Sequence, residues 1–190
     1  MSAPLIDLAL CIRHWDWSET SQTVALSTRG HGVVRALAKG SRRPKAPYSG
    51  GVELLALAEI GLIPRPRSDL ALLTSWDLRE SFPALRSSLA AYNAGMYVAE
   101  MLLQFVRDHD PLPALFDATV AAVRAMTDEE AVPEALLRFQ WALLSECGFK
   151  PEIDADVATG AALEKRTDYL FDPALGGVTV RAGESAVPGW

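Results

Sequence analysis

The side chains with the clearest chemical potential are basic and lie in the first half of the chain. Eight basic residues and two acidic ones occur between Arg29 and Arg67. The basic residues are Arg29, Arg35, Lys39, Arg42, Arg43, Lys45, Arg65 and Arg67. Four of them, from Lys39 to Lys45, share one segment that prolines stiffen, so their charges are held along one edge of the structure. This pattern favours contact with nucleic-acid phosphates, which depends on charge and not on base sequence.

A solvated charged loop is the simplest alternative for these four residues, because basic runs usually face solvent. The hypothesis of a phosphate-binding loop therefore centres on Lys39, Arg42, Arg43 and Lys45, and Arg35, Arg65 and Arg67 are candidates for extending it.

Three aromatic residues near this segment suit a second kind of contact. Trp15, Trp17 and Tyr48 have flat rings on which bases can stack without sequence preference. Aromatic side chains also fill protein cores routinely. Trp17 and Tyr48 are therefore candidates for base stacking, with core packing as the competing interpretation.

The charge of the chain is unevenly distributed. The net charge is −6, yet residues 1–80 contain ten basic and eight acidic residues, whereas residues 81–190 contain eight and sixteen.

The two cysteines, Cys11 and Cys147, are far apart and outside any CxxC spacing, which is typical of a reducing compartment. No apolar run approaches the roughly 18 residues that span a bilayer. We expect a cytoplasmic, nucleoid-associated protein that contacts no membrane.

Catalytic motifs are missing from the sequence. Cys11, His14, His31 and His109 form no recognisable set, and no nucleophile elbow, zinc-protease motif or phosphate-binding glycine loop occurs. Cys11 is interpreted as a buried strand residue and His31 as a turn residue. We expect a protein that is not an enzyme and needs neither ATP nor another cofactor.

Short apolar segments separated by turn residues fill the first eighty positions. They cover 5–13, 21–28, 33–39, 52–63 and 70–76, and in the second of them Val24 and Leu26 share a face. Alternation with period two indicates strands. Five short strands in about 80 residues favour a five-stranded OB-fold barrel. The segment 52–63 is equally compatible with a buried helix.

After Pro83 the period becomes helical. Leu85, Leu89, Tyr92, Met96, Ala99, Leu103 and Val106 form an apolar stripe with spacings of three and four. A second helix is expected over 114–126, with Leu115, Thr119, Val120, Val123 and Met126 facing inward, and a third from Pro133, with Leu136, Phe139, Leu143 and Cys147 buried and Gly148 as its cap. The predicted organisation is α+β: a nucleic-acid-binding barrel at 1–81 and a helical domain at 82–190, irregular from about 151.

Three motifs in order resemble the RecO family of bacterial recombination mediators. They are Trp17-Ser18-Glu19-Thr20-Ser21, Thr28-Arg29-Gly30-His31-Gly32 and the loop from Ala38 to Lys45. Fainter similarity continues through Leu73-Thr74, Tyr97–Leu102, Leu115-Phe116 and Leu143–Pro151, so the resemblance covers nearly the whole chain. It implies the same barrel and helical domain.

The family resemblance also implies a zinc-finger-like segment near the C-terminus. The positions that match its paired cysteines are Asp156, Thr159, Val180 and Gly183. A structural zinc site needs four nitrogen or sulfur ligands, which these residues do not supply. The segment is therefore interpreted as degenerate, and no metal is expected.

The resemblance implies a mediator that binds single- and double-stranded DNA, promotes annealing and loads RecA together with RecR and single-stranded DNA-binding protein. It further implies that the C-terminal tail of single-stranded DNA-binding protein docks in a helical groove. Arg107, Arg124 and Arg138 are the basic residues available for that groove. The alternative is a protein-interaction module whose acidic helical half binds a partner and whose barrel is vestigial.

Overall fold

The computed structural model describes residues 4–43, 48, 51–65, 68–165 and 167–180. By its internal contacts the chain divides into two compact units, Met1–Leu143 and Leu144–Trp190, and each is described separately. The sequence-based boundary between residues 81 and 82 falls inside the first unit, at the junction of the barrel and the helices, and it stays a prediction.

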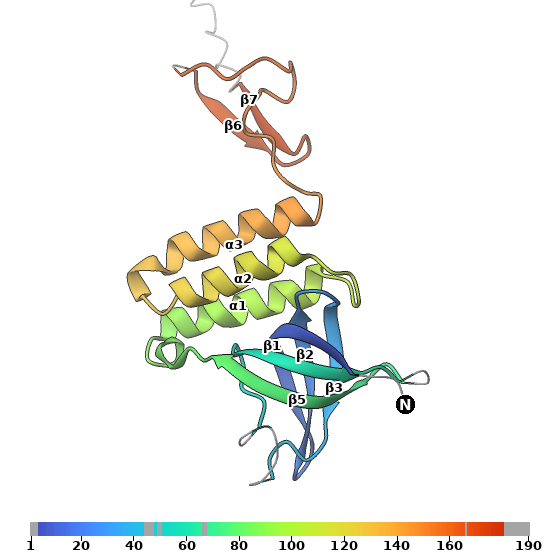
Figure 1. The fold of residues 1–190 in the computed structure, drawn as a ribbon. Helices are drawn as coiled ribbons and strands as arrows, with labels where there is room; N and C mark the ends of the chain where they lie inside the picture. The colour runs from blue at the N-terminus through green and yellow to red at the C-terminus, as the bar shows by residue number, and fades with distance from the viewer. Residues whose placement is uncertain (1–3, 44–47, 49–50, 66–67, 166, 181–190) are drawn as a thin grey trace, which may run out of the picture. The chain divides into compact units, whose positions relative to one another are not determined.

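The first unit begins with a closed barrel of five strands (Figure 1). The strands are β1 (Leu5–Ser18), β2 (Ser21–Thr28), β3 (Gly32–Ala38), β4 (Leu57–Ile63) and β5 (Ala71–Glu80). Their order is β1-β2-β3-β5-β4, and β4 returns to pair with β1. All pairs are antiparallel except β3 with β5. The predicted OB-fold barrel is confirmed.

The barrel interior is filled by aliphatic side chains, because alternate residues of each strand point inward. Val24 and Leu26 both belong to this core, as their shared face predicted. The ambiguous segment 52–63 is a strand from Leu57 onward. Before it, the Leu55 N–H donates to the Cys11 carbonyl at 2.7 Å, which joins the incoming chain to β1.

Helices follow the barrel, and α1 contacts β1 (Figure 1). The helical elements are η1 (Pro83–Arg86), α1 (Leu89–Phe105), α2 (Pro113–Ala125), η2 (Glu129–Ala131) and α3 (Val132–Glu146). The five side chains predicted to face inward from α2 are all buried, as are Phe139 and Leu143 of α3. Leu136 and Cys147 are only partly buried, and Gly148 has the positive φ of +80° expected of a helix cap.

The predicted apolar stripe is wrong in its phase along α1, and of its seven members Leu85 and Ala99 are the buried ones. Leu89 is 77% exposed and Tyr92 is 41% exposed, although both were placed in the core. The buried face consists of smaller residues: Ala91, Ala94, Gly95, Val98, Ala99 and Leu102. At Gly95 an added Cβ would lie 2.6 Å from Leu55 Cδ1, so a side chain at this position would require Leu55 to move.

The β2–β3 hairpin fixes the barrel to the segment between α1 and α2. Gly32 has φ +68°, and a Cβ there would lie 2.5 Å from the backbone nitrogen and oxygen of Asp110. One residue further on, the Val33 carbonyl accepts a hydrogen bond of 3.1 Å from the His109 N–H. On the other side of the turn, Arg29 forms a two-pronged ion pair with Asp117 of α2, with N···O distances of 2.9 and 2.8 Å. These contacts hold the barrel and the helices together as one unit.

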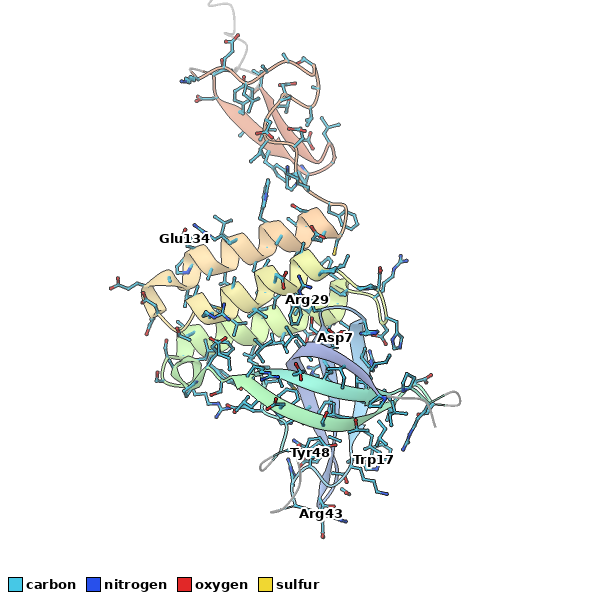
Figure 2. All side chains as sticks on the ribbon, in the orientation of Figure 1. Asp7, Trp17, Arg29, Arg43, Tyr48 and Glu134 are labelled. Carbon is cyan, nitrogen blue, oxygen red and sulfur yellow. The ribbon has the colours of Figure 1, made fainter. Side chains whose placement is uncertain are left out.

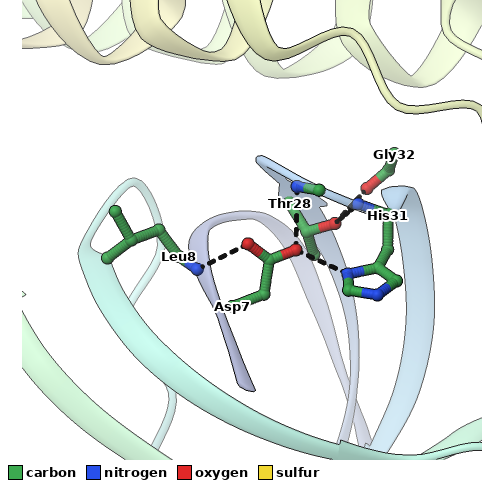
Figure 3. A network of polar contacts seen from close by, with 6 residues as sticks. Asp7, Leu8, Thr28, His31 and Gly32 are labelled. Carbon is green, nitrogen blue, oxygen red and sulfur yellow. Dashed lines mark hydrogen bonds and ion pairs between the residues drawn. The ribbon is translucent and has the colours of Figure 1, made fainter. Parts of the chain in front are cut away.

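A carboxylate at the start of β1 holds the same hairpin from below (Figure 3). Asp7 Oδ2 accepts the Gly30 N–H at 2.9 Å and lies 2.7 Å from His31 Nδ1, and Oδ1 accepts the Leu8 N–H. The Thr28 hydroxyl donates to the Gly32 carbonyl and accepts the His31 N–H. The turn-residue interpretation of His31 is confirmed, and the Thr-x-x-His-Gly motif forms this turn.

The second unit contains a small antiparallel sheet in the segment predicted to be irregular. Its strands are β6 (Tyr169–Asp172) and β7 (Gly177–Val180). Among the described residues of both units, no helix combines the length and the apolar character required to cross a membrane.

Substitution of Gly32 tests the close approach of the β2–β3 hairpin to the backbone of Asp110. The variant Gly32→Ala should lower the free energy of unfolding by about 3 kcal/mol, from left-handed strain plus overpacking against Asp110. Urea denaturation of the full chain measures this loss. Gly40→Ala is the matched control, because Gly40 also has a positive φ of +71° but meets only the flexible side chain of Arg43. Equal losses in the two variants would contradict the close approach at Asp110.

Candidate nucleic-acid interface

The basic segment leaves the barrel at the end of β3 and contacts the turn between β1 and β2. The Gly40 N–H donates to Ser21 Oγ at 3.0 Å, and the Arg42 N–H donates to the Thr20 carbonyl at 3.1 Å. Lys39, Arg42 and Arg43 therefore lie at the barrel end that carries the β1–β2 turn. Figure 2 shows Arg43 and Trp17 at this end, away from the helices of the first unit.

A buried glutamine anchors both ends of the loop. Gln22 Oε1 accepts hydrogen bonds from the Ser41 hydroxyl at 3.0 Å and from the Val52 N–H at 3.1 Å. Gln22 and Ser41 are both buried, so these bonds are shielded from competition with water. The loop is thus fixed at its two ends, before Arg42 and at Val52.

The basic side chains differ in how far their charge is already compensated. Arg42 pairs with Asp16, and Arg35 Nε lies 3.4 Å from Asp108 Oδ2. Lys39 and Arg43 are exposed, and neither forms an ion pair with another residue in the described part of the chain. Lys45 and Arg67 lie outside the described residues. Within the loop, Lys39 and Arg43 are therefore the cations most available to a phosphate.

Arg65 does not join this group. It follows β4, and near the end of β4 Leu62 pairs with Leu5 at the start of β1. The basic loop instead contacts Thr20, just beyond the end of the 14-residue strand β1. Arg65 consequently lies at the opposite end of the barrel, which contradicts the expectation that it extends the same track.

Two tryptophans of β1 present their rings to solvent. Trp15 is 44% exposed and Trp17 is 62% exposed, and the pairing of β1 with β2 shifts in register between Asp16 and Ser18, which interrupts the regular alternation of faces at Trp17. The Arg13 guanidinium lies 5.7 Å from the Trp15 ring centre, a distance typical of a cation–π contact. Trp15, which the sequence also suggested for stacking, therefore remains a candidate together with Trp17.

Tyr48 does not offer a stacking surface. It is 4% exposed, its hydroxyl donates to the Leu73 carbonyl, and burial raises its pKa. The prediction that Tyr48 stacks on bases is wrong, because the ring completes the barrel core. This outcome matches the competing interpretation of core packing.

The three arginines proposed for a helical groove do not converge. Arg107 follows α1, whereas Arg124 lies at the far end of the 13-residue helix α2, about 18 Å along its axis. Arg124 forms a two-pronged pair with Glu80, and Arg138 pairs with Glu134 on its own helix at 2.6 Å. Arg138 and Glu134 line a cavity of about 210 Å³ with Ala125, Ala131 and Ala135. Arg138 is the one member of the trio that borders this cavity.

Cys11 has no access to solvent. It is fully buried, and this burial raises the pKa of its thiol to about 12. The thiolate form is therefore negligible at neutral pH. The interpretation of Cys11 as a buried strand residue is confirmed.

Asp156 organises the segment that resembles a zinc finger. Its two carboxylate oxygens accept five hydrogen bonds, which come from the Ala158, Thr159 and Val180 N–H groups and the Thr159 and Thr179 hydroxyls. These bonds lower its pKa from 3.8 to about 2, and the Val180 N–H contributes most. Among the described residues, no three His, Cys, Asp or Glu side chains are grouped to hold a metal ion. Three of the four matched positions, Asp156, Thr159 and Val180, are joined by hydrogen bonds, and Gly183 lies outside the described residues.

The barrel and the helical layer behind it define the class of protein, an OB-fold domain with a basic loop and a helical domain. Models of the recombination protein O N-terminal and C-terminal domains match residues 1–82 and 86–187. The chain belongs to the RecO family.

The chain is similar to several proteins named DNA repair protein RecO. It is 39% identical to that of Rhodopirellula baltica over 172 residues, which covers 90% of this chain and 64% of the relative. It is 34% identical to that of Idiomarina loihiensis over 173 residues, with 90% and 72% covered, and 32% identical to that of Myxococcus xanthus over 188 residues, with 96% and 76% covered. The chain thus spans about two thirds to three quarters of the length of these relatives.

Asp156 makes the second unit sensitive to acid. Because its pKa is lowered on folding, it stabilises this unit above about pH 4, and this contribution is lost as the pH falls towards about 2. Asp156→Asn should remove this pH-dependent contribution, since an amide carries no charge and its nitrogen cannot accept the hydrogen bonds that one carboxylate oxygen accepts. Hydrogen exchange of the Thr159 and Val180 amides in the full chain should be faster in this variant at pH 6. Asp154→Asn is the control, because Asp154 is exposed. Unchanged exchange in Asp156→Asn would contradict the role of the carboxylate.

Proposed function

We propose that this protein acts in DNA repair and recombination by binding single- and double-stranded DNA at the basic end of its barrel. The observation that carries the proposal is the anchored loop with two exposed cations, Lys39 and Arg43, beside the exposed ring of Trp17. OB-fold barrels bind oligonucleotides through their loops and open faces. The relatives named DNA repair protein RecO support the same role.

The proposed contacts are independent of base sequence. Lysine and arginine neutralise phosphates and release condensed counterions, and exposed tryptophans stack on unpaired bases. A surface that neutralises the charge of two strands lowers their mutual repulsion, which favours annealing. Arg42 joins the contact when a phosphate competes with Asp16 for its guanidinium.

We further propose that the protein works through binding partners and not through catalysis. Its partners in this role are RecR and single-stranded DNA-binding protein, and together they load RecA onto DNA. The cavity beside Arg138 is the candidate site for the tail of single-stranded DNA-binding protein. The buried thiol of Cys11 is consistent with a function that needs no nucleophile.

A protein-interaction module with a vestigial barrel is the second candidate function. The observation that favours it is that two of the candidate arginines, Arg35 and Arg42, are paired with carboxylates of the same chain. In that case the acidic helices would carry the function, and DNA binding would be weak or absent.

Reversal of the loop charges distinguishes the two functions. The variant Lys39→Glu/Arg43→Glu should weaken binding of a labelled oligonucleotide at least about tenfold at 50 mM salt and reduce the slope of log K against log salt by about two, one for each lost phosphate contact. Fluorescence anisotropy at several salt concentrations measures both quantities. Arg138→Glu is the control, since Arg138 is an exposed arginine on α3. Binding that is unaffected in the loop variant, or absent in the wild type, would favour the interaction module.

Trp17 should distinguish single strands from duplexes. Trp17→Ala is expected to weaken single-stranded DNA binding by about 1–3 kcal/mol through the loss of one stacked base, and to leave duplex binding within about twofold, because paired bases do not expose their faces. Competition anisotropy with matched single- and double-stranded oligonucleotides measures the difference. Tyr48→Phe should leave both affinities unchanged, since Tyr48 is buried. An equal loss of both affinities in Trp17→Ala would exclude stacking.

A further inference from the structure

A second recess lies at the barrel end opposite the basic loop. Its volume is about 230 Å³, below the roughly 300 Å³ at which pockets for drug-sized ligands begin. Among the described residues, its aliphatic lining is formed by Leu5, Val34, Leu62, Pro64 and Ala71, and its polar lining by His31, Arg65, Ser68, Asp69 and His109. The recess combines an apolar lining with several convergent polar groups, which is the general character of a small-molecule site.

The recess exists because the barrel wall is incomplete at this end. β3 pairs with β5 only at Ala36 and Leu37. Towards the start of β3, Val33 forms a bridge with Asp108 of the α1–α2 connection instead. The recess lies beside this short ladder, where Leu5 is 39% exposed and Val34 and Leu62 are almost fully buried.

Both histidines of the recess are held in place by other contacts. Asp7 lies 2.7 Å from His31 Nδ1, so Nε2 is the ring nitrogen left for a ligand (Figure 3). His109 has a left-handed backbone with φ +63°, and its N–H donates to the Val33 carbonyl. Such a conformation is uncommon for a residue other than glycine and persists only where the surroundings impose it. The His31 ring and the His109 backbone are thus both fixed at this recess.

The fixed charges of the recess have opposite signs. Arg65 and Asp69 both belong to the β4–β5 connection, and neither is ion-paired with another described residue. A ligand with only a phosphate or only an ammonium group would meet one unfavourable charge. A ligand with both an anionic and a cationic group would satisfy Arg65 and Asp69 together. The apolar residues that the structure describes in this lining are all aliphatic, so none of them offers a ring on which a nucleobase could stack.

We propose that this recess binds a free aliphatic α-amino acid of about the size of leucine. Its carboxylate would be bound by Arg65 and the two imidazoles, its ammonium by Asp69, and its side chain by Val34 and the other aliphatic residues. This site is separate from the proposed DNA contact, because the basic loop lies at the other end of the barrel.

Titration of the full chain with L-leucine tests the proposal. The imidazole signals of His31 and His109 in NMR spectra should shift together and reach saturation. L-leucinamide, which lacks the carboxylate, and N-acetyl-L-leucine, which lacks the ammonium group, should each bind at least about tenfold more weakly, since a charge-assisted contact is lost. Glycine should also bind more weakly, because it has no side chain for the apolar lining. No saturable shift, or equal affinity for leucine and either analogue, would overturn the assignment.

Substitutions at the rim provide a second test. Arg65→Gln and Asp69→Asn should each weaken leucine binding about tenfold, and both lie on an exposed connection where they leave the fold intact. Arg107→Gln and Asp154→Asn are matched controls, because these exposed residues do not line the recess. Amide spectra of each variant verify the fold. Undiminished leucine affinity in either rim variant would contradict the proposed contacts.

Discussion

The parallel pairing of β3 with β5 is the constraint on which both ends of the barrel depend. It joins only Ala36 with Ala71 and Leu37 with Leu72, yet it closes the sheet into a barrel. Just after these pairs the chain leaves β3 as the basic loop, so the loop begins where the barrel wall ends. Before these pairs β3 separates from β5, and the recess beside Val34 opens. If more residues of β3 paired with β5, the recess would be closed and the basic loop would begin later in the chain.

The position of the helices depends on a second constraint, the contact of the β2–β3 hairpin with the connection between α1 and α2. Gly32 permits a backbone approach to Asp110 that no side chain allows, and Asp7 compensates for the sharp turn by accepting the Gly30 N–H. The hairpin motif is therefore a docking element for the helical connection, and its role is distinct from that of the basic loop. This division explains how one small barrel can carry helices at one end and leave the other end exposed.

The sequence was sufficient to predict most strands and helices, but it was insufficient to predict which side chains contact one another in the folded protein. Alternation of apolar residues located the strands, and it placed Val24 and Leu26 in the core correctly. The phase of α1 was missed because its buried face includes three alanines and Gly95, which lies against Leu55, whereas large apolar side chains such as Leu89 remain exposed. Periodicity weighs hydrophobicity and contains no information on close approach. Likewise, nothing local to Arg42 indicates Asp16 as its partner, and nothing local to Arg65 places it beyond the reach of the loop.

Asp156 shows how a segment that resembles a zinc finger can be held together by hydrogen bonds to one carboxylate. In a structural zinc site, four ligands from two separate stretches of chain meet at one metal ion. Here one carboxylate, which can only accept hydrogen bonds, joins Thr159 in its own turn to Thr179 and Val180 in β7. Oδ1 accepts the three hydrogen bonds from its own turn and Oδ2 accepts the two from β7, so the two stretches are joined without a second ligand. The stability of the segment then depends on the protonation of one group, and for that reason the low pKa of Asp156 is a structural property and not a sign of catalysis.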